Sequence, residues 1–127
     1  MIAADTSTWI AFLGGGHGED VQLLDEALGG RQLLMVPVVL TELLSDPNLP
    51  PAIAERLYQL PMIEIQTGYW QRAGALRAQA LGRKRKARLG DALIAQCCID
   101  RGIPLLTRDR GFRVFADAVS LDLLLLI

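Results

Sequence analysis

The sequence lacks the hallmarks of a membrane-spanning or secreted protein. None of its apolar runs approaches the roughly 18 residues that a membrane-spanning helix needs. Its first residues have neither the basic segment nor the apolar segment of a secretory signal. We therefore expect a cytoplasmic protein with no membrane partner. The length of 127 residues fits one domain, residues 1–127, with one hydrophobic core.

Cysteine and histidine are also scarce. The only cysteines, Cys97 and Cys98, are adjacent, a spacing that matches neither a CxxC redox motif nor a zinc-binding pair. They lie in an apolar helical segment, so we expect buried free thiols. The only histidine, His17, lies in a glycine-rich loop, where a general-base role is not expected. The carboxylates are therefore the main candidates for functional side chains in this chain.

Acidic residues are missing from residues 65–90, which carry seven bases. Residues 1–64 carry nine acids and two bases, and residues 91–127 carry five acids and four bases. The basic block thus lies between acidic flanks, although the net charge is only −1. A solvated loop and a surface that contacts RNA phosphates or an acidic partner both remain open for this block. Its densest part is the basic run, Arg83, Lys84, Arg85, Lys86 and Arg88.

Apolar patterning and glycine or proline breaks predict alternating strands and helices. Thr6 or Ser7 is expected to cap the first helix. An α/β domain with a largely parallel sheet follows from the alternation. The expected strands cover residues 1–4, 33–36, 62–65 and 103–107, with an edge strand at 119–121. The expected helices run from the cap at Thr6 or Ser7 to about residue 13, from 19 to the stop at Gly29-Gly30, and over about 37–45, 51–60, 69–81 and 91–99. A short helix or turn near 112–115 follows, and an apolar tail at 123–127 is expected to pack on the domain or on a partner.

Four acids fall where the local apolar pattern should bury them. Asp5 and Asp109 follow predicted strands, and Glu42 and Asp91 lie early in predicted helices that start from the same sheet edge. Buried, clustered carboxylates lose hydration and repel one another, so such a set indicates a hard divalent metal ion. Singly, each acid has a structural explanation as a cap, a turn former or a surface residue. Together they predict a metal-dependent hydrolase.

Hydroxyl side chains lie beside these acids. Thr6, Ser7 and Thr107 either cap helices or orient a carboxylate or a metal-bound water. Capping is the favoured role for Ser7.

Four short motifs, in this order, resemble those of PIN domains, and specifically of VapC-type toxins of VapBC toxin–antitoxin systems. The resemblance extends over nearly the whole chain. The motifs are Asp5-Thr6-Ser7, Thr41-Glu42-Leu43, Gly90-Asp91-Ala92-Leu93-Ile94-Ala95 and Leu106-Thr107-Arg108-Asp109-Arg110-Gly111-Phe112.

The resemblance implies a three-layer α/β/α fold, bound Mg²⁺ or Mn²⁺, endonucleolytic cleavage of RNA, a homodimer and a VapB-like antitoxin partner. By position, Asp5, Glu42, Asp91 and Asp109 would be the acidic catalytic set. Asp5, Asp91 and Asp109 would hold the metal, with Thr6 and Thr107 as accessory groups. Many relatives carry a further acid where this chain has Gly111, which weakens the expectation of a second metal.

The predicted reaction is phosphodiester hydrolysis by metal-activated water. A phosphatase that forms an aspartyl-phosphate at Asp5 is an alternative, but Ser7 stands where the haloacid-dehalogenase pattern has a second aspartate. A receiver-type signalling domain would need a lysine late in the chain, whereas the only lysines are Lys84 and Lys86. A non-catalytic or housekeeping PIN-like RNA-binding or processing protein also remains open. Metal-dependent turnover of RNA would distinguish the enzyme from the binding protein.

Overall fold

The structure, a computed structural model, describes residues 1–118 and 123–125. Strands and helices alternate along the chain, as expected. The elements are β1 (Ala3–Ala4), α1 (Thr6–Leu13), α2 (Glu19–Gly29), α3 (Pro37–Leu44), α4 (Pro51–Tyr58), α5 (Tyr69–Gly82), α6 (Leu89–Arg101), β2 (Leu105–Thr107), the 3₁₀ turn η1 (Arg110–Phe112), α7 (Arg113–Ala118) and β3 (Leu123–Leu125).

The strands form a parallel sheet in the order β1, β2, β3. Ala3 pairs with Leu105, and Leu105 in turn pairs with Leu123, so the apolar tail supplies a strand. Two isolated parallel bridges extend the sheet beyond β1, from Ile2 to Leu33 and from Met35 to Met62. All the described pairings are parallel, which agrees with the predicted α/β class.

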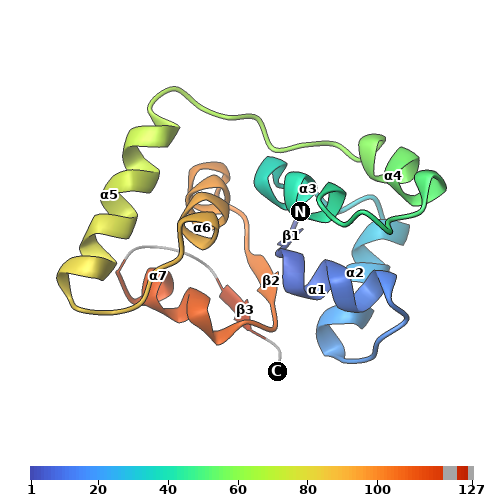
Figure 1. Cartoon of the computed structure of the whole chain (residues 1–127), viewed down its shortest axis with the longest axis horizontal. Helices are drawn as coiled ribbons and strands as arrows, with labels where there is room; N and C mark the ends of the chain where they lie inside the picture. The colour runs from blue at the N-terminus through green and yellow to red at the C-terminus, as the bar shows by residue number, and fades with distance from the viewer. Residues whose placement is uncertain (119–122, 126–127) are drawn as a thin grey trace.

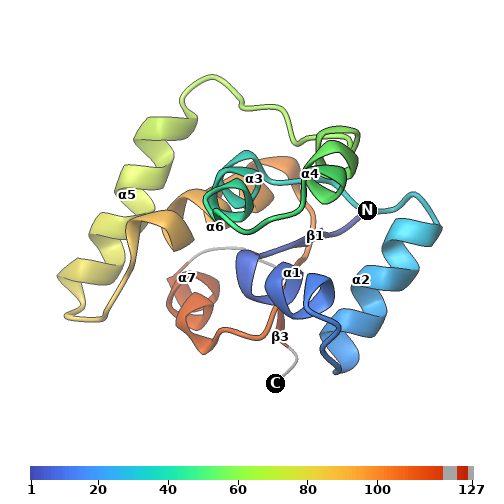
Figure 2. The same cartoon turned by 45° about the vertical axis from the view of Figure 1, so that its right-hand side comes forward.

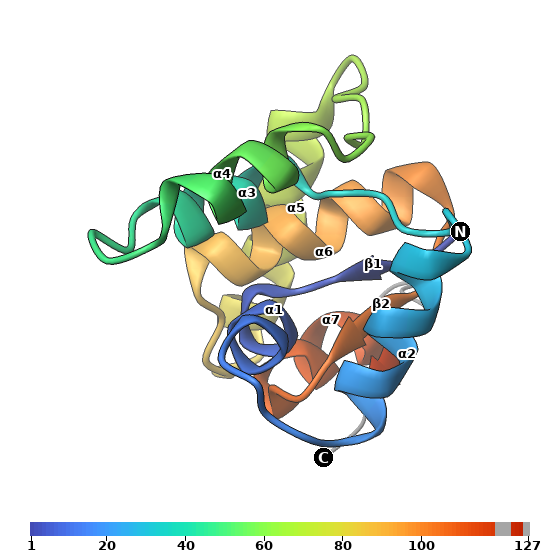
Figure 3. The same ribbon diagram turned by 90° about the vertical axis from the view of Figure 1, so that its right-hand side faces the viewer.

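Helices cover both faces of this sheet. In Figure 1, α5 and α6 lie on one side of β2, and α1 and α2 lie on the other. Figure 3 shows β1 and β2 side by side between α6 and α1. The short helix α7 packs on α5, as Figure 2 shows. The arrangement is the predicted three-layer α/β/α fold.

Helix α6 forms the centre of the core. Six of its residues from Ala92 to Cys98 are buried, among them both cysteines, which are free thiols as expected. Burial raises the pKa of Cys97 to about 11, so this thiol stays protonated and unreactive at neutral pH. The helix ends at Gly102, whose φ of 71° is a left-handed conformation that glycine adopts without steric cost.

Two local predictions need correction or narrowing, and a third is not tested. The N-cap of α1 is Asp5, not Thr6 or Ser7, because Asp5 is extended and its carboxylate accepts the Thr8 N–H. Residues 33–36 and 62–65 contribute single bridges rather than full strands. The edge strand predicted at 119–121 lies outside the described residues. Within the part of the chain that is described, no helix has the length and apolar content to cross a membrane.

Candidate active site

Asp5 lies where β1 ends and α1 begins, and its side chain is held by three donors. Residue Asp5 is only 3% exposed. Its Oδ1 accepts from the Thr8 N–H at 3.1 Å, and its Oδ2 accepts from the Thr107 hydroxyl at 2.7 Å. The Ser7 hydroxyl lies 2.8 and 3.0 Å from the two oxygens. Because a carboxylate has about four acceptor positions, three donors leave one for a further ligand.

Burial raises the pKa of Asp5, while the hydrogen bonds from Thr107, Ser7 and Thr8 act in the opposite direction. Burial is the larger effect, so the ionised form is disfavoured by its surroundings. A cation next to Asp5 would remove that penalty.

Thr107, the last residue of β2, connects Asp5 to Asp109. Its fully buried hydroxyl donates to Asp5 Oδ2 and accepts from the Asp109 N–H at 2.9 Å. The predicted accessory position is therefore in direct contact with two of the predicted metal ligands. Asp109 caps the η1 turn, with Oδ1 accepting from the Gly111 N–H at 2.8 Å.

Asp91 lies in the first turn of α6, as predicted, with its side chain 17% exposed. Burial raises its pKa to about 6, Arg88 opposes that shift, and the charges of Asp109, Asp5 and Glu42 add to it. Asp5, Glu42 and Asp109 thus all lie within electrostatic reach of Asp91. Their repulsion is the pattern expected where a cation belongs.

Glu42 is exposed, so the expectation that it would be buried is wrong. The side chain leaves the surface of α3 at the rim of the site and its Oε1 accepts from the Thr6 hydroxyl at 2.7 Å. A Cβ added to Gly90 would lie 3.9 Å from Glu42 Oε2, so α3 brings this acid to the start of α6. Thr6 therefore orients Glu42.

Arg88, the residue that precedes α6, reaches into the acidic set. Its Nε lies 3.6 Å from Asp91 Oδ2, and its Nη2 lies 3.4 Å from Asp109 Oδ2. With the side chains in this arrangement, no three Asp, Glu, His or Cys residues among 1–118 and 123–125 form a ready-made metal-binding group. In this arrangement the acidic side chains do not surround a single point.

The rest of the basic run is an exposed loop between α5 and α6. Arg83, Lys84, Arg85 and Lys86 are all exposed, and the loop leads directly to Arg88 and the start of α6. The sequence could not choose between a solvated loop and a phosphate-binding surface, and the loop placement is compatible with both.

Gly111, the position at which the resemblance to VapC-type toxins leads us to expect a further acid, lies next to Asp109, whose Oδ1 accepts its N–H. A Cβ at this position would lie 3.0 Å from Asp109 Oδ1, which is closer than most real contacts. A side chain here would require the Asp109 carboxylate to shift.

A partly buried ion pair that the sequence did not reveal holds the loop after β2. Arg108 donates from Nε to Asp20 Oδ2 at 2.6 Å and from Nη2 to Asp20 Oδ1 at 2.7 Å. The Thr8 hydroxyl donates to the same carboxylate at 3.0 Å. Gly18 has a φ of 137°, and a Cβ there would lie 2.7 Å from Asp20 Oδ1, so a side chain would push against the pair. The pair fixes the residue that immediately precedes Asp109.

Replacing Asp20 with Ala is expected to lower the free energy of unfolding by about 2–4 kcal/mol at pH 7, because it leaves Arg108 and Thr8 without their partner. Burial alone would raise the pKa of Asp20, but the hydrogen bonds from Arg108 and Thr8 outweigh it and hold the pKa below its ordinary value. The pair therefore stabilises the fold above the ordinary carboxyl pKa, and this contribution is lost as the pH falls through the depressed value.

Urea unfolding at pH 7 and at about pH 3 measures both effects. The difference between the wild type and Asp20→Ala should shrink at the lower pH. Asp25→Ala, an exposed acid on the same helix, is the matched control and should change stability by less than about 0.5 kcal/mol. A pH-independent difference would contradict the role assigned to the pair.

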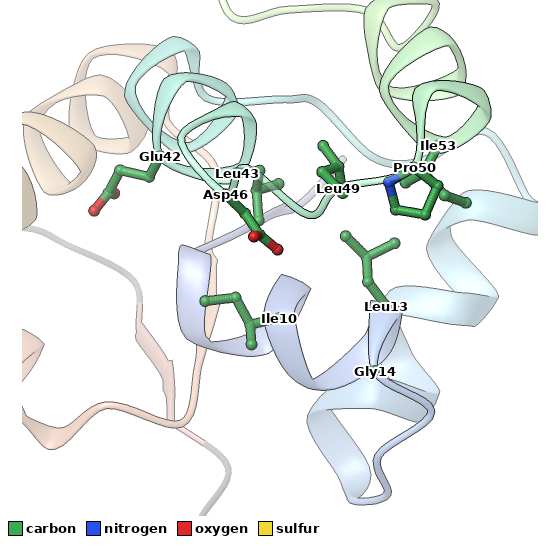
Figure 4. Close-up of a pocket in the computed structure, with 9 residues that line it drawn as sticks. All are labelled: Ile10, Leu13, Gly14, Glu42, Leu43, Asp46, Leu49, Pro50 and Ile53. Carbon is green, nitrogen blue, oxygen red and sulfur yellow. The ribbon is translucent and has the colours of Figure 1, made fainter.

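An apolar hollow of about 430 Å³ opens beside Glu42. Figure 4 shows Leu13 of α1 pointing toward Leu49 and Pro50, while Glu42 lies at the other end and points away from them. Ile10, which borders the hollow, is 61% exposed. The hollow is lined by Ile10, Leu13, Gly14, Glu42, Leu43, Asp46, Leu49, Pro50 and Ile53.

Comparison with known proteins identifies a family. A model of the PIN domain matches residues 2–118 of the chain. A comparison with curated proteins finds no match.

Three solved structures share this fold at 20% sequence identity or less. A member of the VapBC family of toxin–antitoxin systems, VapBC-5 from Mycobacterium tuberculosis, is similar with a TM-score of 0.72 and 20% identity, covering 98% of this chain and 97% of that chain. FitAcB from Neisseria gonorrhoeae is similar with a TM-score of 0.72 and 19% identity, covering 97% and 96%. FitAB bound to an IR36 DNA fragment is similar with a TM-score of 0.71 and 17% identity, covering 97% and 93%.

Proposed function

Because the chain belongs to the PIN-domain family, we propose that it is a metal-dependent endoribonuclease that acts in the cytoplasm as the toxin of a type II toxin–antitoxin pair. The observation that carries the proposal is the convergence of Asp5, Asp91 and Asp109 from three distant segments. Burial and mutual repulsion raise the pKa of Asp91, and Asp5 keeps a free acceptor position. Oxygen ligands in a negatively charged setting fit Mg²⁺ or Mn²⁺.

In this proposal, Asp5, Asp91 and Asp109 hold the ion. When bound there, Mg²⁺ or Mn²⁺ supplies Lewis acidity, which activates water as the nucleophile and offsets charge on the phosphate. Thr107 keeps Asp5 in one orientation through its 2.7 Å hydrogen bond and stays fixed by the Asp109 N–H. Glu42, oriented by Thr6, accepts a proton from the attacking water at the open side of the site.

The basic run supplies the surface for the RNA backbone. Arg83, Lys84 and Lys86 are exposed on the loop that leads to α6, so phosphates bound there would lie next to the acidic site. This positively charged loop lies beside a negatively charged centre, which would repel a phosphate unless the ion were bound. Binding of the substrate therefore depends on the ion.

Incubation of the purified protein with a single-stranded RNA tests the function. We expect fragments with Mn²⁺ or Mg²⁺ present, none in excess EDTA, and recovery when Mn²⁺ is added back beyond the chelator. Recovery separates this activity from contaminating ribonucleases that need no metal. Undiminished cleavage in EDTA, or an RNA mobility shift that never yields fragments, would argue against the proposal and, in the second case, favour an RNA-binding protein.

We also propose that a VapB-like antitoxin binds the apolar hollow. The similar solved structures include a VapBC complex, and here an exposed Ile10 and an apolar wall border the acidic site. An apolar helix or strand of the antitoxin would bury this wall, and a basic side chain next to it would reach toward Glu42 and Asp46.

Ile10→Glu is expected to weaken antitoxin binding about tenfold or more, since it places a charge at an apolar contact. The measurement is co-purification and titration with the product of any small gene found immediately upstream of the gene for this protein. Leu81→Glu, an equally drastic change at an exposed apolar residue of α5, is the control and should leave binding unchanged. If Ile10→Glu bound the antitoxin as tightly as the wild type, the antitoxin would have to bind at another surface.

A further inference from the structure

Arg88 bridges two of the acids assigned to the metal. One guanidinium faces both Asp91 Oδ2, at 3.6 Å, and Asp109 Oδ2, at 3.4 Å. These acids lie on different elements, α6 and the turn after β2, so Arg88 occupies the space between them. A divalent ion held by Asp91 and Asp109 would need the same carboxylate edges.

The contacts of Arg88 are loose in comparison with the structural ion pairs of the same protein. Arg108 reaches Asp20 at 2.6 Å and Arg72 reaches Asp100 at 2.6 Å, both with paired hydrogen bonds. Arg88 is 75% exposed and makes neither contact shorter than 3.4 Å. Exposed pairs with such geometry contribute little to stability. The ion pairs of Arg88 therefore do not serve mainly to stabilise the fold.

Resting on the proposed function, we propose that Arg88 is the resident counter-ion of the acidic site, which a divalent metal ion displaces and which then holds a phosphate of the RNA. The guanidinium partly neutralises Asp91 and Asp109 while no ion is bound. Once a divalent ion takes their charge, the guanidinium is repelled by that ion, and the nearest anion is the RNA backbone. Arg88 ends the basic run, so its release adds a positive charge to the surface proposed to bind RNA.

If Arg88 competes with the metal ion, removing it should strengthen Mn²⁺ binding and weaken RNA binding. A residue with only a structural role would not produce this combination. Arg88→Gln should bind Mn²⁺ about three- to tenfold more tightly, because two weak ion pairs no longer compete. The same variant should have a KM for RNA about three- to tenfold higher, because a phosphate contact is lost. Arg88→Lys, which keeps the charge, should have a KM for RNA close to that of the wild type.

Calorimetric titration of the full chain with Mn²⁺ and steady-state cleavage of a single-stranded RNA measure the two effects. Arg101→Gln is the matched control, with the same charge change at the far end of α6, about 20 Å along the helix. It should change neither value.

The outcomes separate this inference from the function on which it rests. Tighter Mn²⁺ binding by Arg88→Gln, together with a raised KM, supports the inference. If the wild type cleaves RNA but Arg88→Gln binds Mn²⁺ no more tightly than the wild type, the inference is overturned and the proposed function is not. A wild type that binds no Mn²⁺ overturns the metal-dependent function and the inference with it.

Discussion

Asp91→Asn is expected to abolish RNA cleavage, by about a thousandfold or more, and to make the metal-free protein more stable. The loss of activity follows from removing a metal ligand and its charge. The gain in stability follows from the surroundings of Asp91, where burial raises the pKa to about 6 and three other acids repel it, with only Arg88 in opposition. Neutral Asn removes these unfavourable terms, so the free energy of unfolding at pH 7 should rise by about 1–2 kcal/mol.

Urea unfolding without metal and a cleavage assay with Mn²⁺ measure the two sides of this prediction. Mn²⁺ should raise the melting temperature of the wild type and have little effect on the variant, because ligand binding stabilises only a state that binds it. Asp25→Asn on the exposed face of α2 serves as the control for removal of an acid. An Asp91→Asn variant with full activity would refute the assignment, and an inactive variant of lower stability would assign Asp91 to the fold instead.

Local rules predicted most of the helices because the signals are local. Gly102 ends α6 where the left-handed residue is required, and Pro37 and Pro51 begin α3 and α4. The strands were harder to predict, since pairing depends on distant partners. The bridge from Met35 to Met62 involves one residue on each side, and the tail becomes β3 only because β2 offers it an edge.

The candidate site shows the same division. That Asp5 and Asp109 follow strands could be predicted from the sequence, and the two acids share Thr107 in the structure. The exposure of Glu42 could not be predicted from the sequence. Its apolar neighbours three and four residues earlier place it on the apolar face of the helix, but they do not show how much of that face is buried. Sequence distance also concealed the pair of Asp20 with Arg108, which is 88 residues away. Asp20 also lies in the first turn of α2, where a carboxylate is favoured whatever its partner, so its position alone does not indicate the pair.

The two kinds of acid in this chain differ in how their charge is compensated. Asp20 has a bidentate arginine partner at 2.6–2.7 Å, and its pKa lies below the ordinary value, so its charge stabilises the fold. Asp5 and Asp91 have raised pKa values. Residues whose charge the protein itself does not compensate are candidates for binding an external cation. This electrostatic distinction, rather than acidity alone, separates Asp5 and Asp91 from the structural acid Asp20.

Asp5 combines both roles, and two substitutions should separate them. Asp5→Ala is expected to abolish cleavage and to lower the free energy of unfolding by about 2–4 kcal/mol, because α1 loses its N-cap and the hydroxyls of Thr107 and Ser7 lose their acceptor. Asp5→Asn should abolish cleavage equally, yet stay within about 1 kcal/mol of wild type, because its amide oxygen still accepts the Thr8 N–H while the buried charge is gone.

Denaturation of both variants measures their free energies of unfolding, and titration with Mn²⁺ measures their binding of the metal. Neither should bind Mn²⁺ as the wild type does, although only Asp5→Ala should be destabilised. Ser45→Ala is a control for the loss of a hydrogen-bonding side chain at the surface, since its hydroxyl donates to the Thr41 carbonyl in an exposed turn. If Asp5→Asn cleaved RNA at the wild-type rate, the oxygen atoms of Asp5 would serve the helix cap and not the ion, and the metal would have to rest on Asp91 and Asp109 alone. Two carboxylates alone hold Mg²⁺ weakly without substrate phosphate, so activity would then depend steeply on metal concentration.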